Sequence, residues 1–504
     1  MSVNINPMAA PSPQAKTLKF LEANHELLID GKWQKAQDGA TLDVVDPATG
    51  KPLATVACGG AADVDIAVTA ARRAFEGEWS TKCGFDRAEI LRKLARIVEE
   101  HSETLAELDT VDNGMPIMLA RMIVGNTSSL FNYYAGWAER IEGTTTTPPS
   151  MILAEAEAFT YTLKEPVGVV GMVLPWNVPL SMAALKLGPA LAAGCTVVLK
   201  PAEDTPLATL YLGHLLEEAG IPPGVVNIIP GLGHTAGAAL AAHDDVDKIA
   251  FTGSTAVGGE IARAATGNFK KVSLELGGKS PVVVFADADI DLVVPGIAQA
   301  GFFLQGQNCM AGTRIFLEDS IHDEVIERLV AHVKTLKIGN GLDPETQIGP
   351  LITAKHRERV FAYIEAGLAE GATLAVGGDK IDGPGNFLSP TIFTDTTPDM
   401  KIVREEIFGP VIAVQRFKAD DLEEVARQAN DSIYGLSGSV WTRDLSLAHK
   451  MARRIRSGHV SVNCHGAVGP NIPFGGYRQS GWGREFGREG LELFLETKAV
   501  TVRL

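Results

Sequence analysis

One cysteine in a polar, glycine-flanked segment is the residue around which the rest of this sequence can be organised. Cys309 lies in the segment 301–316, GFFLQGQNCMAGTRIF, where an apolar stretch runs into the turn 306–309 and a strand-like stretch follows. A free cysteine is more often a small buried hydrophobe than a reagent. However, glycine lets the backbone bend sharply, and ligands approach at loops. A thiolate there can attack a carbonyl carbon, so Cys309 is a candidate nucleophile if the chain also supplies a base and an oxyanion donor.

Two polar residues at the ends of strand-like stretches are candidates for those roles. Glu275 lies in the apolar stretch LELGG at 274–278. A carboxylate is costly to bury there, and partial burial would raise its pKa toward that of a useful general base. Asn177 follows Pro175 and Trp176. An asparagine in such a turn is usually a turn former, but its amide can also donate to a developing oxyanion.

Glycine-rich turns before helix-like stretches indicate a nucleotide site. The segment 231–237, GLGHTAG, approximates the dinucleotide fingerprint, and 251–258, FTGSTAVG, repeats the arrangement one unit later. Such turns offer backbone N–H groups and a helix N-terminus to an anion, although Ser254 also fits a simple N-cap. Lys200 and Glu203 form either a surface ion pair or, at the carboxyl edge of a nucleotide-binding sheet, a site where Glu203 accepts hydrogen bonds from ribose hydroxyls.

The elements that must position these residues alternate strands with helices. After residue 167 we expect strands at 167–174, 196–199, 225–229, 248–251 and 272–276, separated by helices at 180–193, 206–219, 235–242 and 255–265. This alternation predicts βαβ units and a parallel sheet that binds ligands beyond the carboxyl ends of its strands. A second α/β region is expected from 281 to about 482, with strands at 282–285, 313–317, 411–417, 437–441 and 459–462 and helices at 321–336 and 421–430.

The N-terminal part predicts two hairpins and a helix. The DG turn in 27–33 and the segment 44–56 have hairpin patterns, and the apolar positions between 90 and 98 repeat at helical spacing. The run TTTTPP at 144–149 marks a boundary, and 153–163 then has an extended pattern.

Composition excludes several classes of function. A chain of 504 residues needs two or three domains, and its net charge of −16 disfavours nonspecific binding to nucleic acid or an anionic membrane. Its five cysteines lack CxxC spacing, so we expect no disulfide framework and no metal site, and a cytoplasmic location is favoured. The N-terminus lacks the apolar core of a secretion signal. The most apolar region, 167–199, is interrupted by prolines and polar residues, which argues against a membrane span.

These residues together resemble the aldehyde dehydrogenase superfamily over nearly the whole chain from about Leu28. The similarity rests on eight motifs in the family's order: LPWN at 174–177, KPAEDTP at 200–206, PGLG at 230–233, FTGSTAVG at 251–258, LELGGKS at 274–280, GQNCMAGTR at 306–314, EEIFGPV at 405–411 and PFGGYRQSGWGRE at 473–485. The resemblance implies an α/β fold in three parts. These are a Rossmann-like NAD-binding domain (1–143 and 165–278), an α/β catalytic domain (279–483) and a small β oligomerisation element (144–164 and 484–504).

The resemblance also implies a role for individual residues. It makes Cys309 the nucleophile, Glu275 the general base and Asn177 the oxyanion donor for oxidation of an aldehyde to a carboxylic acid through a thiohemiacetal and a thioester. NAD is the implied cofactor, with NADP less favoured because Glu203 would repel a 2′-phosphate. Residues expected to bind the cofactor are Val173, Leu174, Pro175, Trp176, Lys200, Glu203, Gly233, Phe251, Gly253, Ser254, Gly258, Leu276, Glu406 and Phe408. A homo-oligomer, dimer or tetramer, is expected.

The substrate is expected to be a medium or large hydrophobic aldehyde, aromatic or aliphatic. Several expected tunnel positions carry Val or Leu (Val178, Leu185, Val468) where relatives that use small aldehydes carry bulky aromatics. None of the tunnel positions is cationic, which disfavours an acidic semialdehyde. The tunnel residues implied by the resemblance are Val178, Met182, Leu185, Asn308, Met310, Val468 and Phe474.

Two other readings remain open at this stage. A CoA-acylating dehydrogenase would share the fold and Cys309, but such relatives generally lack a carboxylate at the position of Glu275. A nonenzymatic structural protein on the same scaffold would have no need of the set Cys309, Glu275 and Asn177.

Overall fold

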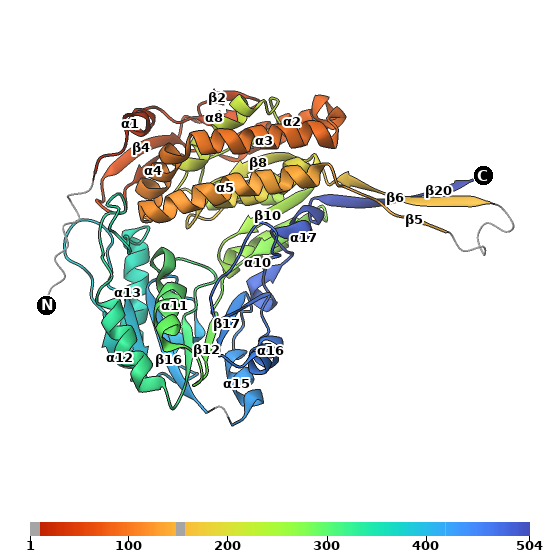
Figure 1. Cartoon of the computed structure of the whole chain (residues 1–504). Helices are drawn as coiled ribbons and strands as arrows, with labels where there is room; N and C mark the ends of the chain where they lie inside the picture. The colour runs from red at the N-terminus through yellow and green to blue at the C-terminus, as the bar shows by residue number, and fades with distance from the viewer. Residues whose placement is uncertain (1–10, 148–156, 419) are drawn as a thin grey trace.

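Two α/β lobes and a narrow β arm make up the structure, a computed structural model that describes residues 11–147, 157–418 and 420–504 (Figure 1). The first lobe is formed mainly by the N-terminal half of the chain and the second by residues after about 280. The arm projects away from both lobes and carries the C-terminus at its tip (Figure 1). None of the helices in these ranges is both long and apolar enough to cross a bilayer.

The first lobe is built on an eight-stranded sheet whose five central strands are parallel. Residues on these strands are almost all buried, as expected for a sheet covered by helices on both faces. Two N-terminal strands extend one edge in antiparallel fashion, and a short strand from near the C-terminus extends the other. In spatial order the strands are β19 (Gly481–Trp482), β11 (Lys271–Glu275), β10 (Lys248–Thr252), β7 (Val169–Val173), β8 (Thr196–Lys200), β9 (Val226–Ile228), β1 (Leu27–Ile29) and β2 (Lys32–Gln34).

The helices between these strands follow the predicted alternation. A departure occurs at the predicted helix 235–242, which begins as a π-helical turn over Gly233–Gly237 and only then continues as a short α-helix. The hairpins predicted at 27–33 and 44–56 are present, the second as β3 (Thr41–Val45) paired with β4 (Pro52–Ala57). The helices of this lobe include α2 (Ala61–Glu76), α3 (Gly84–Glu100), α4 (Ser102–Asn113), α5 (Ile117–Ala138), α7 (Pro179–Ala193), α8 (Leu207–Ala219), α9 (Ala238–Ala242) and α10 (Thr255–Ala265).

The second lobe contains a seven-stranded sheet in which only one edge strand is antiparallel. All five predicted strands are present, and two further strands extend the sheet beyond β16. In spatial order they are β14 (Thr373–Val376), β15 (Thr391–Thr394), β16 (Val411–Phe417), β13 (Arg314–Glu318), β12 (Pro281–Val284), β17 (Ser437–Trp441) and β18 (His459–Val462). The larger helices of this lobe are α11 (Ile290–Phe302), α12 (His322–Val333), α13 (Ala354–Ala369), α15 (Leu422–Ala429) and α16 (Leu445–Arg454).

The arm is a three-stranded antiparallel sheet made by segments far apart in the sequence. The central strand β6 (Ala158–Pro166) pairs along its whole length with the C-terminal strand β20 (Leu495–Arg503) and, on its other side, with β5 (Thr145–Thr146). Phe159, Leu163 and Val502 are exposed on this arm. Part of the extended pattern expected at 153–163 falls on residues 153–156, which lie outside the described ranges.

Candidate active site

A loop between α11 and β13 presents Cys309 at the junction of the two lobes. Just before it, Leu304 and Gln305 adopt left-handed backbone conformations with φ of 53° and 58°. This conformation is costly for residues with a side chain, so neighbouring structure must hold it in place. The buried Gln305 amide donates to the carbonyls of Gly114 and Pro350, each at 3.2 Å, and Gln307 Oε1 accepts a hydrogen bond from the backbone of Ile352 at 3.0 Å. The loop is thus anchored on its N-terminal side.

Cys309 and Glu275 are close enough for the charge of Glu275 to act on the thiol. Glu275 ends strand β11 and is 4% exposed, whereas Cys309 keeps partial exposure. Burial raises the pKa of the Cys309 thiol well above its usual value, and the negative charges of Glu275 and Glu406 raise it further. Burial is also the main cause that raises the pKa of Glu275 well above its usual value. In the absence of other ligands the thiol is therefore neutral, and a thiolate needs a group that accepts its proton.

Asn177 lies two residues before α7, with its amide directed at the loop that carries Cys309. It is 6% exposed, and its Nδ2 donates to the carbonyl of Gln307 at 3.0 Å. An amide nitrogen carries two hydrogens, so this bond orients the group and leaves a second N–H to donate elsewhere. The preceding peptide is held by Asn113, whose Nδ2 donates to the Trp176 carbonyl at 2.7 Å.

A buried ion pair next to Glu275 was not predicted as part of the site. Lys186, on helix α7, is 1% exposed and forms an ion pair with Glu485 from the C-terminal segment. The charge of Glu485 raises the pKa of Glu275, and that of Lys186 lowers it. A lysine inside an apolar helix is the sequence signal that could have identified this pair, because a buried charge requires a partner.

The predicted cofactor residues gather at the carboxyl ends of the strands in the first sheet. Lys200 is 2% exposed, so its contact with Glu203 is not the surface ion pair of the simpler interpretation. Its Nζ donates to Glu203 Oε2 at 3.1 Å and to the carbonyls of Pro201 and Gly231, both at 2.7 Å. A methyl group built on Gly233 would meet only Glu203 Oε1, at 3.8 Å, so open space lies beside this carboxylate.

The remaining cofactor candidates line the same edge from β7 to β11. Ser254 caps α10 by accepting from the Val257 backbone at 3.4 Å, and its exposed position leaves the helix N-terminus open. A methyl group built on Gly253 would lie 2.5 Å from the Phe251 ring, and one on Gly258 would lie 2.5 Å from Leu276, so a larger residue at either position would displace that side chain. Val173, Leu174 and Pro175 lead from the end of β7 toward Trp176.

A second group of candidates comes from the other lobe and faces this edge. Glu406 Oε1 accepts the backbone N–H of Gly278 at 2.9 Å, and burial raises the pKa of Glu406 to about 7. Phe408, in a left-handed conformation, packs edge-on against Trp176 with ring centroids 5.2 Å apart. The predicted cofactor residues thus come from both lobes.

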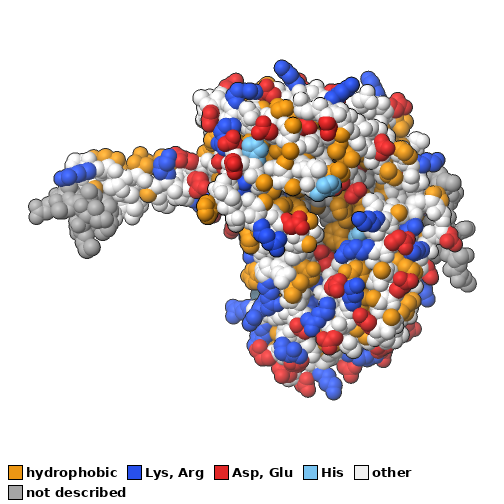
Figure 2. Space-filling view, turned by 180° about the vertical axis from the view of Figure 1, so that it is seen from behind, with side chains coloured by type: hydrophobic (Ala, Val, Ile, Leu, Met, Phe, Trp, Pro, Cys, Tyr) orange, Lys and Arg blue, Asp and Glu red, His pale blue; other side chains and the backbone are white. Residues whose placement is uncertain are grey.

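Most of the predicted tunnel residues are apolar and pack against one hydrophobic cluster. Figure 2 shows that the surface is hollowed where the lobes meet and that hydrophobic side chains gather in the hollow. Partly buried Val178, Met182, Met310 and Val468 pack against one hydrophobic cluster together with Cys309 and with Phe303, which was not predicted. Asn308 lies partly exposed next to them, while Leu185 and Phe474 are buried within the cluster, at 2% and 5% exposure.

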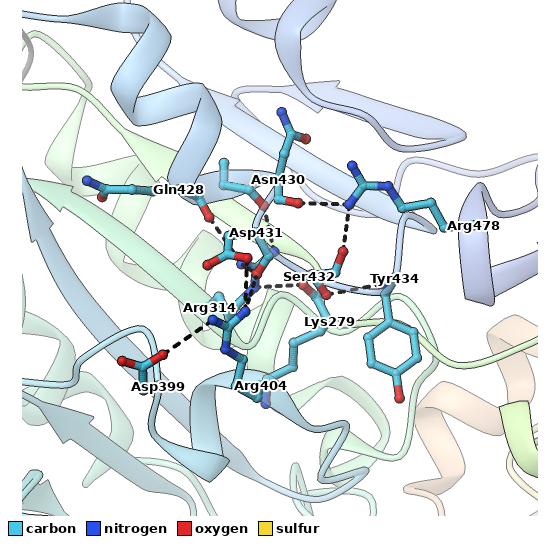
Figure 3. A network of polar contacts seen from close by, with 11 residues as sticks. Lys279, Arg314, Asp399, Arg404, Gln428, Asn430, Asp431, Ser432, Tyr434 and Arg478 are labelled. Carbon is cyan, nitrogen blue, oxygen red and sulfur yellow. Dashed lines mark hydrogen bonds and ion pairs between the residues drawn. The ribbon is translucent and has the colours of Figure 1, made fainter.

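Three arginines hold the segment 430–436, which connects α15 to β17 (Figure 3). The buried Arg314 donates to the carbonyls of Lys279, Ala429, Gln428 and Asp431, while Arg404 pairs with the Asp431 carboxylate and Arg478 donates to the carbonyls of Asn430 and Ser432. Lys279 lies beside this network, and burial lowers its pKa to about 7. Among the described residues, no three His, Cys, Asp or Glu side chains are grouped closely enough to hold a metal ion.

Known proteins share both this fold and this sequence. The model of the "Aldehyde dehydrogenase family" matches residues 33–500. "Putative aldehyde dehydrogenase DhaS" of Bacillus subtilis is 46% identical, covering 96% of this chain and 97% of that protein, and the mitochondrial aldehyde dehydrogenase of Homo sapiens is 44% identical, covering 98% and 95%. The NAD+ complex of the aldehyde dehydrogenase from Bacillus cereus superposes with a TM-score of 0.95 at 44% identity, covering 98% of this chain and 100% of that one.

The fold and site therefore define an oxidoreductase with two α/β lobes. The chain belongs to the aldehyde dehydrogenase family. Membership and fold class, predicted from the eight motifs, are confirmed.

Proposed function

We propose that this chain oxidises a medium or large hydrophobic aldehyde to the carboxylic acid, with NAD as cofactor and Cys309 as nucleophile. The observation that carries the proposal is the position of Cys309. Its partly exposed thiol feels the charge of Glu275, and Cys309 packs against the same hydrophobic cluster as Val178 and Val468. The thiol can attack the aldehyde group, and the hydrophobic side chains can contact an apolar substituent on the same molecule.

Each step of the reaction can be assisted by a residue near Cys309. The thiol proton passes to water as Sγ adds to the aldehyde carbon, and the Asn177 amide donates to the resulting oxyanion, an interaction worth about 3 kcal/mol in comparable sites. Bound NAD supplies the acceptor for the hydride that leaves this carbon. Glu275 then removes a proton from water, which attacks the thioester on Cys309 and releases the acid.

The residues present fit NAD. The Glu203 carboxylate, held by Lys200, borders open space above Gly233 and can accept hydrogen bonds from the two ribose hydroxyls of an adenosine. The same charge would repel a 2′-phosphate, so NADP is less favoured. The open N-terminus of α10 at Ser254 suits a pyrophosphate, and Glu406 can accept a hydrogen bond from the second ribose. The NAD+ complex of the Bacillus cereus relative supports this choice.

A rate comparison across aldehydes tests the proposal. We expect NADH absorbance to rise with NAD, and the highest kcat/KM with an arylacetaldehyde or a long aliphatic aldehyde. Best efficiency on acetaldehyde or succinate semialdehyde would refute the substrate class. Cys309→Ala should abolish NADH formation, and substantial residual turnover would remove Cys309 from the mechanism. Stimulation of turnover by CoA would favour a CoA-acylating enzyme instead, and no NADH with any aldehyde would favour a structural protein.

We also propose that the arm mediates assembly into a dimer or tetramer in the cytoplasm. Small β-sheets of two or three strands are marginally stable without a partner layer. This arm leaves Phe159, Leu163 and Val502 exposed, and a second copy of the chain would cover them. Five free cysteines are consistent with a reducing compartment.

A further inference from the structure

A chain of hydrogen bonds from the second sheet reaches the peptide that follows Cys309. His465 lies in the loop after β18, with Nε2 2.7 Å from the carbonyl oxygen of Met310 and Nδ1 2.9 Å from Ser439 Oγ. Ser439 is fully buried on β17, and Trp441 Nε1 lies 3.2 Å from the same Oγ. The chain of contacts therefore runs Trp441, Ser439, His465, Met310.

The donors in this chain can be assigned from chemistry alone. The indole N–H of Trp441 can only donate, so Ser439 Oγ accepts from it. The Met310 carbonyl can also only accept, so His465 Nε2 carries the ring hydrogen and donates to it. In the neutral ring, Nδ1 then accepts the hydroxyl hydrogen of Ser439. Burial lowers the pKa of His465 to about 4, so the ring stays neutral and keeps this tautomer near neutral pH.

The same ring also packs against the loop. A methyl group built on Gly312 would lie 3.1 Å from His465 Cε1, and one built on Gly466 would lie 3.1 Å from Met310 Sδ. The loop that carries His465 therefore contacts both the backbone and the side chain of Met310, the residue after Cys309. Upstream of Cys309 the loop is anchored by Gln305 and Gln307, so His465 supplies the corresponding anchor downstream.

We propose that His465 is a positioning residue that fixes the Met310 peptide and thereby the direction in which the Cys309 thiol and backbone N–H face the aldehyde. The inference rests on the proposed role of Cys309 as nucleophile. His465 itself does no proton transfer in the reaction. It acts through the hydrogen bond from Nε2, and Ser439 acts one step further back by selecting the tautomer.

Two amide substitutions at this position form a matched pair. The side chain of His465→Gln can place an N–H near the position of Nε2, whereas that of His465→Asn is shorter and reaches only to the region of Nδ1. Both are neutral and both lack the ring. The rate of the first NADH burst at saturating NAD and aldehyde is the main readout, and the dissociation constant of NAD is measured alongside.

We expect His465→Asn to slow the burst about tenfold, the factor for loss of one neutral hydrogen bond, with NAD affinity unchanged. His465→Gln should restore the burst to within about threefold of the original rate. Equal burst rates for the two variants would overturn the proposal. If both were equally slow, loss of ring packing would explain the result, and if both were unchanged, His465 would have no effect. A slow burst that comes entirely from weaker NAD binding would also overturn the proposal.

Two further variants keep the test decisive. If neither amide variant folds, Ser439→Ala should fold and still slow the burst, because Nδ1 loses the donor that selects its tautomer; an unchanged burst would overturn the proposal. Cys309→Ala separates this inference from the proposed function. Turnover in that variant would disprove Cys309 as the nucleophile. An inactive Cys309→Ala together with a normal burst in His465→Asn would disprove only the positioning role of His465.

Discussion

Replacing Glu275 by glutamine should separate hydride formation from release of the product. The substitution keeps the size of a side chain that is 4% exposed and removes its charge. A positioned general base contributes roughly 10²–10⁴ in rate, about 3–5 kcal/mol of barrier. We therefore expect about one NADH per site in a burst, followed by turnover at least about a hundredfold slower than in the unmodified enzyme. Stopped-flow absorbance at 340 nm measures both phases.

The same variant should make the thiol more acidic. The charge of Glu275 raises the pKa of Cys309, so glutamine at this position should lower that pKa. The rate of alkylation of the Cys309 peptide by iodoacetamide should then reach half its maximum at a lower pH. Full turnover together with an unchanged alkylation profile would refute the role of Glu275 as base and as neighbour of the thiol.

Stability should change with pH in a direction fixed by burial. The folded-state pKa of Glu275 is raised above its ordinary value of 4.5, so ionisation favours the unfolded chain. Below pH 4.5 the group is neutral in both states and contributes nothing. As the pH rises through that value the unfolded state alone ionises, and stability is lost. Glu275→Gln should thus have a higher Tm than the unmodified protein at pH 7, with the gap closing on acidification. A gap that widens at low pH would contradict the argument.

Three further predictions concern the cofactor, the substrate and the arm. Glu203→Gln should raise the ratio of kcat/KM for NADP over NAD about tenfold, because the repelling charge is gone; an unchanged ratio would argue against its contact with the ribose. Val468→Phe should lower kcat/KM for long or aromatic aldehydes more than for acetaldehyde, and equal losses would exclude a tunnel wall at this position. Deleting Leu495–Leu504 should give a smaller species by light scattering, and an unchanged mass would exclude the arm from assembly.

The sequence predicts the strands of both sheets well where apolar runs are bounded by glycine or proline. Helix α10 begins and ends at the predicted residues Thr255 and Ala265, and β16, β17 and β18 match their predicted ranges. Local patterns suffice there because a strand buried on both faces is apolar throughout. Strands β14 and β15 were missed: β14 is a partly exposed edge strand, and β15, with the sequence TIFT, has only two apolar residues.

Contacts between distant segments were not predicted from local patterns. Lys186 is one of the polar residues that interrupt the apolar stretch 167–199, and its partner Glu485 comes from the far end of the chain. His465 carries no local signal either, because its partners, Ser439 and the Met310 carbonyl, lie on other segments. Such pairings depend on how the two lobes meet, and periodicity within one element carries no information about that.

Perturbed acidity alone does not locate the active site in this protein. Burial raises the pKa of Asp109 to about 8 and that of Asp112 well above its usual value, as it does for Glu275. Yet Asp112 accepts the backbone N–H of Leu207 at 2.8 Å and so stabilises the N-terminus of α8, a structural task. What distinguishes Glu275 is its neighbour. Its charge acts on the partly exposed thiol of Cys309, so here the cost of burying a carboxylate can change the reactivity of a nucleophile.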